Sequence, residues 1–155
     1  RKIFRISLIG VFILSFIGFI GLALFGLWFY NLWTQNQLEV PSTMWYIMIS
    51  AMLFNAVWYV TEMVFRAFNE PKLMGWFGLG SAIVSVLATY VLSNFMGLTG
   101  AAIGAVLLDA ILVILVVPHG CKLLNFSPKE LVQNGIKDFQ ELYVILTHKL
   151  QRFRT

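Results

Sequence analysis

The chain has 155 residues, of which 59% are hydrophobic and only 12% are charged, and its mean hydropathy is +0.83. Soluble domains carry roughly 25% charged residues, so this composition excludes a water-soluble domain and predicts an all-α membrane protein. The net charge of +4 does not indicate nucleic-acid binding, because the basic residues flank apolar segments instead of gathering in a patch.

Four apolar segments account for most of the chain. The predicted transmembrane helices cover about residues 6–30, 43–68, 74–92 and 98–117, each long enough at ~1.5 Å per residue to cross a hydrocarbon layer of ~30 Å. We therefore expect a four-span bundle over residues 1–118 and a cytoplasmic, amphipathic helical tail over residues 119–155. All four prolines lie outside the span interiors, as continuous helices require: Pro41, Pro71, Pro118 and Pro128.

The first predicted span has a basic start and an aromatic end. Arg1, Lys2 and Arg5 lead directly into it, and because the sequence begins with arginine instead of methionine, we expect it to be a piece of a longer chain. Aromatic side chains at the far end of a span sit at the level of the lipid headgroups. They are Trp28, Phe29, Tyr30 and Trp33.

The second predicted span carries a polar stripe. Asn55, Tyr59, Glu62 and Arg66 occur at i, i+4, i+7 and i+11, which places them along one face of a helix. One interpretation is structural: Glu62 and Arg66 form an i,i+4 ion pair near the inner headgroups, with Arg66 extended toward water. The other is functional: the stripe faces a hydrophilic cavity inside the membrane.

Small residues mark the third and fourth predicted spans. They recur at helical spacing, and they allow a neighbouring helix to approach closely, as in membrane helix pairs. The expected packing positions are Gly78, Ala82 and Ser85 in the third span and Gly97, Gly100, Ala101, Gly104 and Ala105 in the fourth.

Asp109 lies near the middle of the fourth span. A carboxylate at that depth costs roughly 2.5 to 3.5 kcal/mol by insertion scales, so we expect its side chain to face protein, water or a ligand instead of lipid. Two interpretations follow. The carboxyl group lines a substrate path or holds a coupling H⁺ or Na⁺, or it is a structural group bonded to a neighbouring helix.

The distribution of Lys and Arg predicts the topology. Counts at the successive ends of the four spans are three, zero, two, zero and six. Because basic residues are enriched on the cytoplasmic side, this alternation predicts a multi-pass protein of the cytoplasmic membrane with both termini in the cytoplasm.

The tail contains a helix-start signal. In the run Ser127, Pro128, Lys129, Glu130, the serine is a candidate N-cap and the glutamate lies at the third helical position, so a capping box is expected. The amphipathic segment beyond it is expected to lie on the cytoplasmic leaflet, or alternatively to dock onto another domain. The basic residues expected near anionic lipid are Lys149, Arg152 and Arg154.

Nothing in the sequence predicts an enzyme. The two histidines, His119 and His148, lie outside the spans, and the single cysteine, Cys121, has no metal-ligand spacing around it. Asp109 alone is too little to hold the Mg²⁺ of an intramembrane transferase. We therefore expect no cofactor and no metal site.

Two phrases of the sequence resemble a transporter family. GLTGAAIGAVLLD at residues 97–109 and GLWFYNLWTQNQ around residues 26–37 are similar to the closing helices of polysaccharide flippases, within the multidrug, oligosaccharidyl-lipid and polysaccharide exporter superfamily. The resemblance covers roughly residues 1–120. It implies that the four spans are the last four of a twelve-helix, two-lobe transporter whose preceding helices are missing here, and the tail is longer than is usual in the family.

The resemblance also implies a substrate and roles for the polar residues. The substrate is a lipid-linked oligosaccharide that is moved across the membrane for surface polysaccharide synthesis. Arg66, oriented by Glu62, would meet its phosphate, while Asn55, Tyr59 and Asp109 would line the sugar path or a cation site. Two alternatives remain open: a cation-coupled multidrug exporter that uses Glu62 and Asp109, and a small four-span scaffold or assembly protein.

Overall fold

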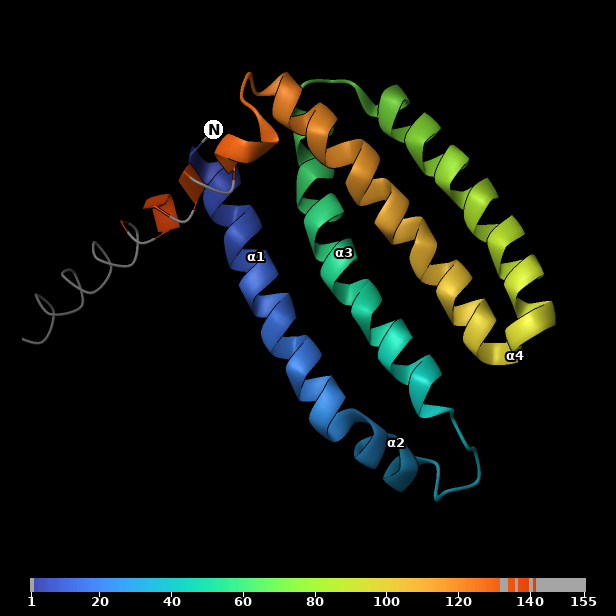
Figure 1. Cartoon of the computed structure of the whole chain (residues 1–155). Helices are drawn as coiled ribbons and strands as arrows, with labels where there is room; N and C mark the ends of the chain where they lie inside the picture. Colours follow the sequence, from blue (N-terminus) through green and yellow to red (C-terminus); the bar gives the residue numbers. More distant parts are fainter. Residues whose placement is uncertain (1, 132–133, 136, 140, 142–155) are drawn as a thin grey trace, which may run out of the picture.

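The computed structural model describes residues 2–131, 134–135, 137–139 and 141, and every regular element within them is helical. This confirms the predicted all-helical class for the described part of the chain. The elements are α1 (Lys2–Gly21), a π-helical segment (Leu22–Gly26), α2 (Leu27–Trp33), α3 (Ser42–Ala67) and α4 (Pro71–Leu123), drawn in Figure 1. Three continuous helical stretches, Lys2–Trp33, Ser42–Ala67 and Pro71–Leu123, are long and apolar enough to cross a membrane.

Helix α4 is a hairpin. Its backbone leaves helical geometry at Gly97 (φ 58°, ψ −135°), where the chain reverses, so residues 71–96 and 98–123 form two antiparallel arms (Figure 1). Glycine adopts a positive φ without the Cβ clash of other residues, which explains why the reversal occurs there. The sequence predicts one span that ends at about residue 92 and the next that begins at about residue 98, whereas the structure turns at one residue and stays helical on both sides.

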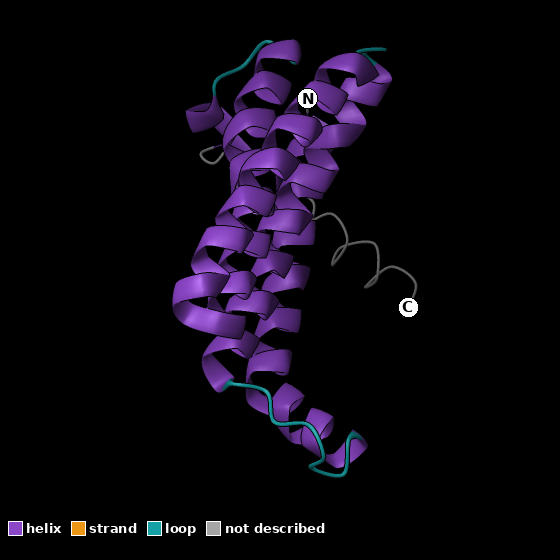
Figure 2. Cartoon of the chain, turned by 90° about the vertical axis from the view of Figure 1, so that its right-hand side faces the viewer, coloured by secondary structure: helices purple, strands orange, loops and turns teal. Residues whose placement is uncertain are grey.

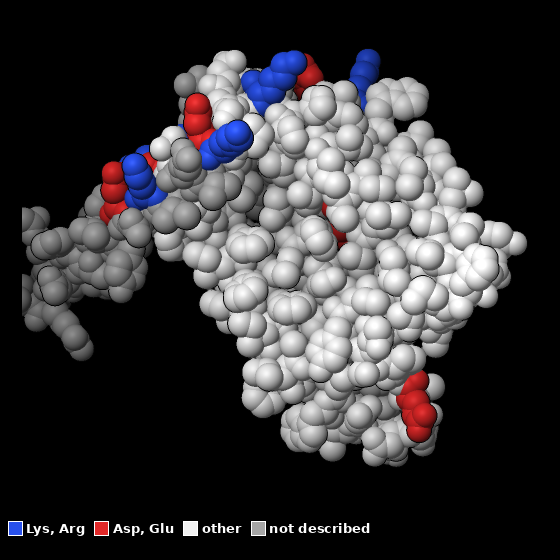
Figure 3. Space-filling model, viewed as in Figure 1, with Lys and Arg blue, Asp and Glu red and all other residues white. Residues whose placement is uncertain are grey.

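Successive rods run in opposite directions and form a flattened bundle (Figures 1 and 2). The start of α1, the α3–α4 connection and the residues directly after Leu123, 124–131, all lie at one end, which we call the charged end (Figure 1). The loop over residues 34–41 and the Gly97 bend lie toward the other end. In Figure 3 the basic side chains in view gather at the charged end.

Asparagine terminates both helices that end at the charged end. Asn69 and Asn125 have φ values of 57° and 56°, and the next amide in each case reaches back to the helix: Glu70 N–H donates to the Phe65 carbonyl at 2.9 Å. Asparagine tolerates the left-handed conformation, and this back-bonded ending satisfies carbonyls that would otherwise lack donors. The sharp ends of α3 and α4 are therefore encoded locally.

The second arm of α4 extends beyond its predicted end. The expected span stops at residue 117 and the expected tail starts at 119, but the helix continues through Pro118 to Leu123. Proline removes only one helical hydrogen bond this close to a helix end. Tertiary packing offsets that loss: a side chain at Gly120 would collide with Thr61 of α3, and Cys121 is fully buried.

Helix α3 is the centre of the fold, since it packs against both α1 and α4. Its Phe65 is completely buried in a cluster with Leu112 and Val116 of α4, while a second cluster at the charged end joins Leu8, Cys121 and Leu131. Both clusters bring together residues from different helices, and they fix how the rods lie relative to one another.

The two arms of the α4 hairpin pack closely at Gly100 and Gly104. A side chain at Gly104 would collide with Thr89, and one at Gly100 would collide with the Leu92 backbone. The Ser85 hydroxyl, which is buried, donates to the Gly104 carbonyl at 2.8 Å. Ser85, Gly100 and Gly104, three of the expected packing positions, therefore lie in the contact between the two arms.

The remaining predicted packing positions differ. Apart from the local backbone of its own helix and its chain neighbours, no described atom lies within 4 Å of a Cβ added at Gly78. Gly97 forms the bend, Ala105 is exposed, and Ala82 and Ala101 are half-buried. The residues of the second arm that touch the first arm are therefore Gly100 and Gly104, and not the neighbouring Gly97, Ala101, Ala105 series.

The first predicted span contains a π-helical segment instead of one unbroken α-helix. The wider turn of a π segment frees a backbone carbonyl, and the Trp45 indole N–H donates to the Leu22 carbonyl at 3.2 Å. A side chain at Gly26 would collide with the same indole ring. One tryptophan at the start of α3 therefore stabilises the irregular geometry in the preceding helix.

The hairpin contact gives a direct stability test. We expect Gly104→Ala to lower the free energy of unfolding in micelles by about 1 to 3 kcal/mol, because its Cβ overlaps Thr89 backbone atoms. The matched control is Gly78→Ala, where the site is open and reduced unfolded-state entropy should leave stability equal or higher. Equal losses for the two variants in denaturant titrations would contradict this packing.

Candidate polar site between α3 and α4

The carboxyl group of Asp109 is bonded to α3. Its Oδ1 accepts from the Trp58 indole Nε1 at 2.7 Å and from the Asn55 amide Nδ2 at 3.4 Å. Asp109 lies on the face of α4 that also carries Leu112 and Val116, which pack against α3. Asp109 therefore contacts α3 through Asn55 and Trp58, and these three residues make up the candidate site.

The second oxygen of Asp109 has no hydrogen-bond partner among the described residues. Both hydrogen bonds use Oδ1, and among the described residues no buried side-chain oxygen lacks a partner, so Oδ2 is accessible at the surface. Asp109 as a whole is half-buried. Figure 3 shows one acidic patch recessed among uncharged atoms about midway between the two ends. This geometry suits a carboxylate whose orientation is fixed while one oxygen stays free to bind.

The polar stripe of α3 divides between different surroundings. Asn55 meets Asp109, whereas Tyr59, 51% exposed, lines an apolar groove of about 570 Å³ between α1 and α3. Arg66 donates from Nε and Nη2 to Glu62 Oε1, at 3.1 and 2.7 Å. The expected ion pair is present, and Asn55, Tyr59 and Arg66 are exposed on a face that the described chain does not cover.

Sequence reasoning missed Trp58, the stronger of the two donors to Asp109. An indole N–H inside an apolar helix needs an acceptor, and Trp58 lies three residues after Asn55, close to the polar face. That need was visible in the sequence. What the sequence lacked was the pairing of α3 with the second arm of α4, which places the acceptor opposite.

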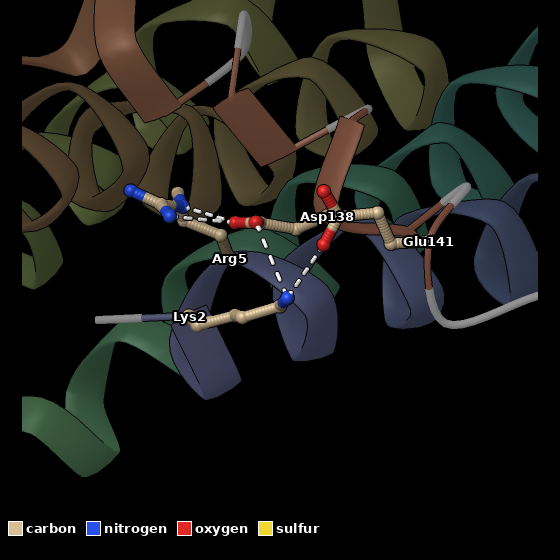
Figure 4. Close-up of polar contacts among 4 residues, drawn as sticks. All are labelled: Lys2, Arg5, Asp138 and Glu141. Carbon is tan, nitrogen blue, oxygen red and sulfur yellow. Dashed lines mark hydrogen bonds and ion pairs between the residues drawn. The ribbon is translucent and has the colours of Figure 1, made fainter. Parts of the chain in front are cut away.

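A second polar site joins the tail to the start of α1 (Figure 4). Asp138 Oδ2 accepts from Arg5 Nε and Nη2, each at 2.6 Å. Lys2 Nζ donates to Glu141 at 2.7 Å and lies 4.0 Å from the other Asp138 oxygen. We call these four residues the ion cluster. Arg5 and Asp138 are only 17% and 13% exposed, so the central pair is well shielded.

The described part of the tail docks onto its own first helix. The predicted capping box is confirmed, since Ser127 and Glu130 exchange hydrogen bonds at 3.4 Å, and the helix starts at Pro128. Beyond it, Gly135 packs on the side chain of Ile9, whose terminal methyl carbon lies 2.6 Å from a Cβ added at the glycine. The surface that these residues contact is α1, whereas most of the amphipathic segment expected to lie on the leaflet or to dock onto another domain is outside the described residues, so both expectations stay predictions. Lys149, Arg152 and Arg154 lie outside the described residues.

No three His, Cys, Asp or Glu side chains come together as metal ligands within the described ranges. Asp109 therefore stands as a single carboxylate with two neutral donors. Such a group can accept a proton, share a monovalent cation with other oxygens, or accept hydrogen bonds from hydroxyl groups.

Comparisons with models of protein families, with curated proteins and with solved structures found no match to this chain.

The Trp58–Asp109 contact can be tested by substitution. We expect Trp58→Phe to reduce the free energy of unfolding by about 1.5 to 3 kcal/mol, the range for a hydrogen bond to a charged group. Trp76→Phe is the control, because Trp76 is 70% exposed. In an Asp109→Ala background the cost of Trp58→Phe should fall, and a cost that stayed unchanged there would refute the pairing.

Proposed function

We propose that this chain is part of a membrane transporter and that the polar face of α3, together with Asp109 of α4, borders the path of its substrate. The observation that carries the proposal is the open oxygen of Asp109 near the middle of an apolar hairpin. A carboxylate held there by Trp58 and Asn55 is costly against lipid. The uncovered face around it therefore calls for a hydrophilic cavity, which further helices would complete.

The proposed topology has four crossings. The two arms of α4 would each span the membrane, as would α3 and the continuous stretch from α1 to α2. Support comes from the charged end, where the segments that carry Lys and Arg meet. Because basic residues mark the cytoplasmic side, we place this end and both termini in the cytoplasm.

The proposed substrate is a lipid-linked oligosaccharide. This choice rests on the resemblance of residues 97–109 and 26–37 to polysaccharide flippases, and the polar groups suit such a ligand. Arg66 is 63% exposed and uses Nε and Nη2 for Glu62, so Nη1 remains to donate to a phosphate at the charged end. Asn55 and Asp109, farther from the charged end, offer the amide and carboxylate groups that bind sugar hydroxyls.

A cation-coupled multidrug exporter is the second candidate. It is favoured by the same free oxygen of Asp109, which could take up H⁺ or Na⁺. It is weakened by Glu62, whose Oε1 receives two donors from Arg66 and so is engaged with a cation of the chain itself.

Substitution of the two charged groups in the complete protein tests the proposal. In cells that depend on it for surface polysaccharide, we expect Asp109→Asn to reduce the polysaccharide about tenfold or more, since a charge-assisted bond is lost. Arg66→Gln should also reduce it. Polysaccharide would be quantified at matched protein levels in the membrane.

Matched controls are available for both changes. Glu39→Gln removes a carboxylate from the loop at the other end, and Lys72→Gln removes a cation near Arg66; both should retain near-normal polysaccharide. If Asp109→Asn and Arg66→Gln behave like these controls, the assigned roles are wrong. If Asp109→Asn abolishes the export of small cationic compounds but leaves the polysaccharide intact, the multidrug exporter is favoured.

A further inference from the structure

We propose that Lys2 and Arg5 form a binding site for the phosphate of an anionic phospholipid, and that the tail occupies this site with Asp138 and Glu141 until such a lipid displaces it. The tail segment of residues 127–141, as far as it is described, is here called the strap. This proposal is independent of the transported substrate, because it needs only that the charged end lie at a leaflet surface.

The two cations are placed where lipid headgroups would be. Lys2 and Arg5 are three residues apart, on adjacent positions of the first turns of α1, and the apolar part of α1 begins immediately after them. A helix that continues into hydrocarbon from this point sets its first turns at headgroup depth. Without the strap, two positive side chains would face that layer with no carboxylate partner among the described residues.

The carboxylates of the strap bind Lys2 and Arg5 as the oxygens of a lipid phosphate would. Asp138 takes two N–H groups of Arg5, at 2.6 Å, and its other oxygen lies 4.0 Å from Lys2, as Figure 4 shows. A phosphate group offers the same arrangement of anionic oxygens to the same donors. Carboxylates on the strap and phosphates in the leaflet are therefore competitors for one pair of cations.

The competition is balanced by apolar contacts. Leu131 of the strap is 6% exposed in the cluster with Leu8 and Cys121, and Phe139 lies 3.8 Å from a Cβ added at Gly10. These contacts hold the strap down where lipids are neutral. Near an anionic leaflet, attraction to the lipid strengthens the binding of each cation to the membrane by about fivefold. The equilibrium therefore shifts toward release of the strap from α1.

Cys121 reports the position of the strap. It is the single cysteine of the sequence, its exposure is 0%, and Leu131 is one of the side chains that cover it. The rate at which a maleimide labels Cys121 would be measured in the whole chain in nanodiscs of phosphatidylcholine, with or without phosphatidylglycerol. We expect labelling at least about tenfold faster with phosphatidylglycerol, whereas free phosphate at equal ionic strength should have no such effect.

Three variants separate lipid binding from other causes. Asp138→Asn should label fast in both lipids. The paired change Arg5→Leu with Asp138→Leu keeps the strap docked through apolar contact and the Lys2–Glu141 pair. It removes Arg5, the more shielded of the two cations, so it should label slowly in both lipids. Lys72→Gln, at the same end but outside the ion cluster, should keep the full lipid response.

Two outcomes would overturn the proposal. One is a labelling rate that does not depend on phosphatidylglycerol. The other is a full lipid response in the paired leucine variant, which would show that basic residues elsewhere in the tail pull the strap away. Circular dichroism would be measured for each variant in each lipid, because a variant that has lost helix also labels fast. Glu141→Gln would then take the place of that variant in the labelling comparison.

Discussion

Polar groups inside apolar helices need partners, and this requirement shapes the whole molecule. Within hydrocarbon there is no water to solvate an unpaired donor or acceptor. The structure meets the requirement by bonds between neighbouring rods: Trp58 to Asp109, Ser85 to the Gly104 carbonyl, and Trp45 to the Leu22 carbonyl. Each bond also fixes the position of one helix against the next. The hydrogen bonds that satisfy these polar groups therefore also determine how the helices pack.

The two polar sites differ in how completely they are satisfied. In the ion cluster, Arg5 and Asp138 are shielded and their charges cancel, as a docking contact requires. At Asp109 one oxygen accepts both hydrogen bonds, and the other has no partner among the described residues. A purely structural carboxyl group would be expected to have both oxygens bonded. This oxygen without a partner is the reason for proposing that the substrate path runs past Asp109.

Much of the fold could be predicted from local signals. Apolar length indicated the helices, the capping box placed the helix start at Pro128, and the GxxxG pair indicated a close helix contact. Features that depend on which rods are neighbours could not be predicted. Trp58 gained its role only because α3 packs on the second arm of α4, the π segment depends on an indole from the following helix, and the helix through Pro118 is held by contacts of Gly120 and Cys121.

The candidate site shows the same division. Asp109 and Asn55 stood out in the sequence because polar residues are rare in the spans, and the structure brings them together. The sequence placed Tyr59 with them on helical spacing alone, yet its ring lies in the groove beside α1, since α1 and α4 flank different sides of α3. Spacing on one helix fixes a face, but the neighbours of that face decide what each residue meets.

The central claim is that Asp109 opens toward a water-filled path instead of lipid. The direct measurement is labelling of the complete protein in membranes by a water-soluble maleimide, with Cys121→Ser as background and one cysteine introduced at a time. We expect Asp109→Cys to be labelled, and Ile114→Cys, at a 70% exposed apolar position on the same arm, to stay unlabelled. Labelling at 114 but not at 109 would contradict the account.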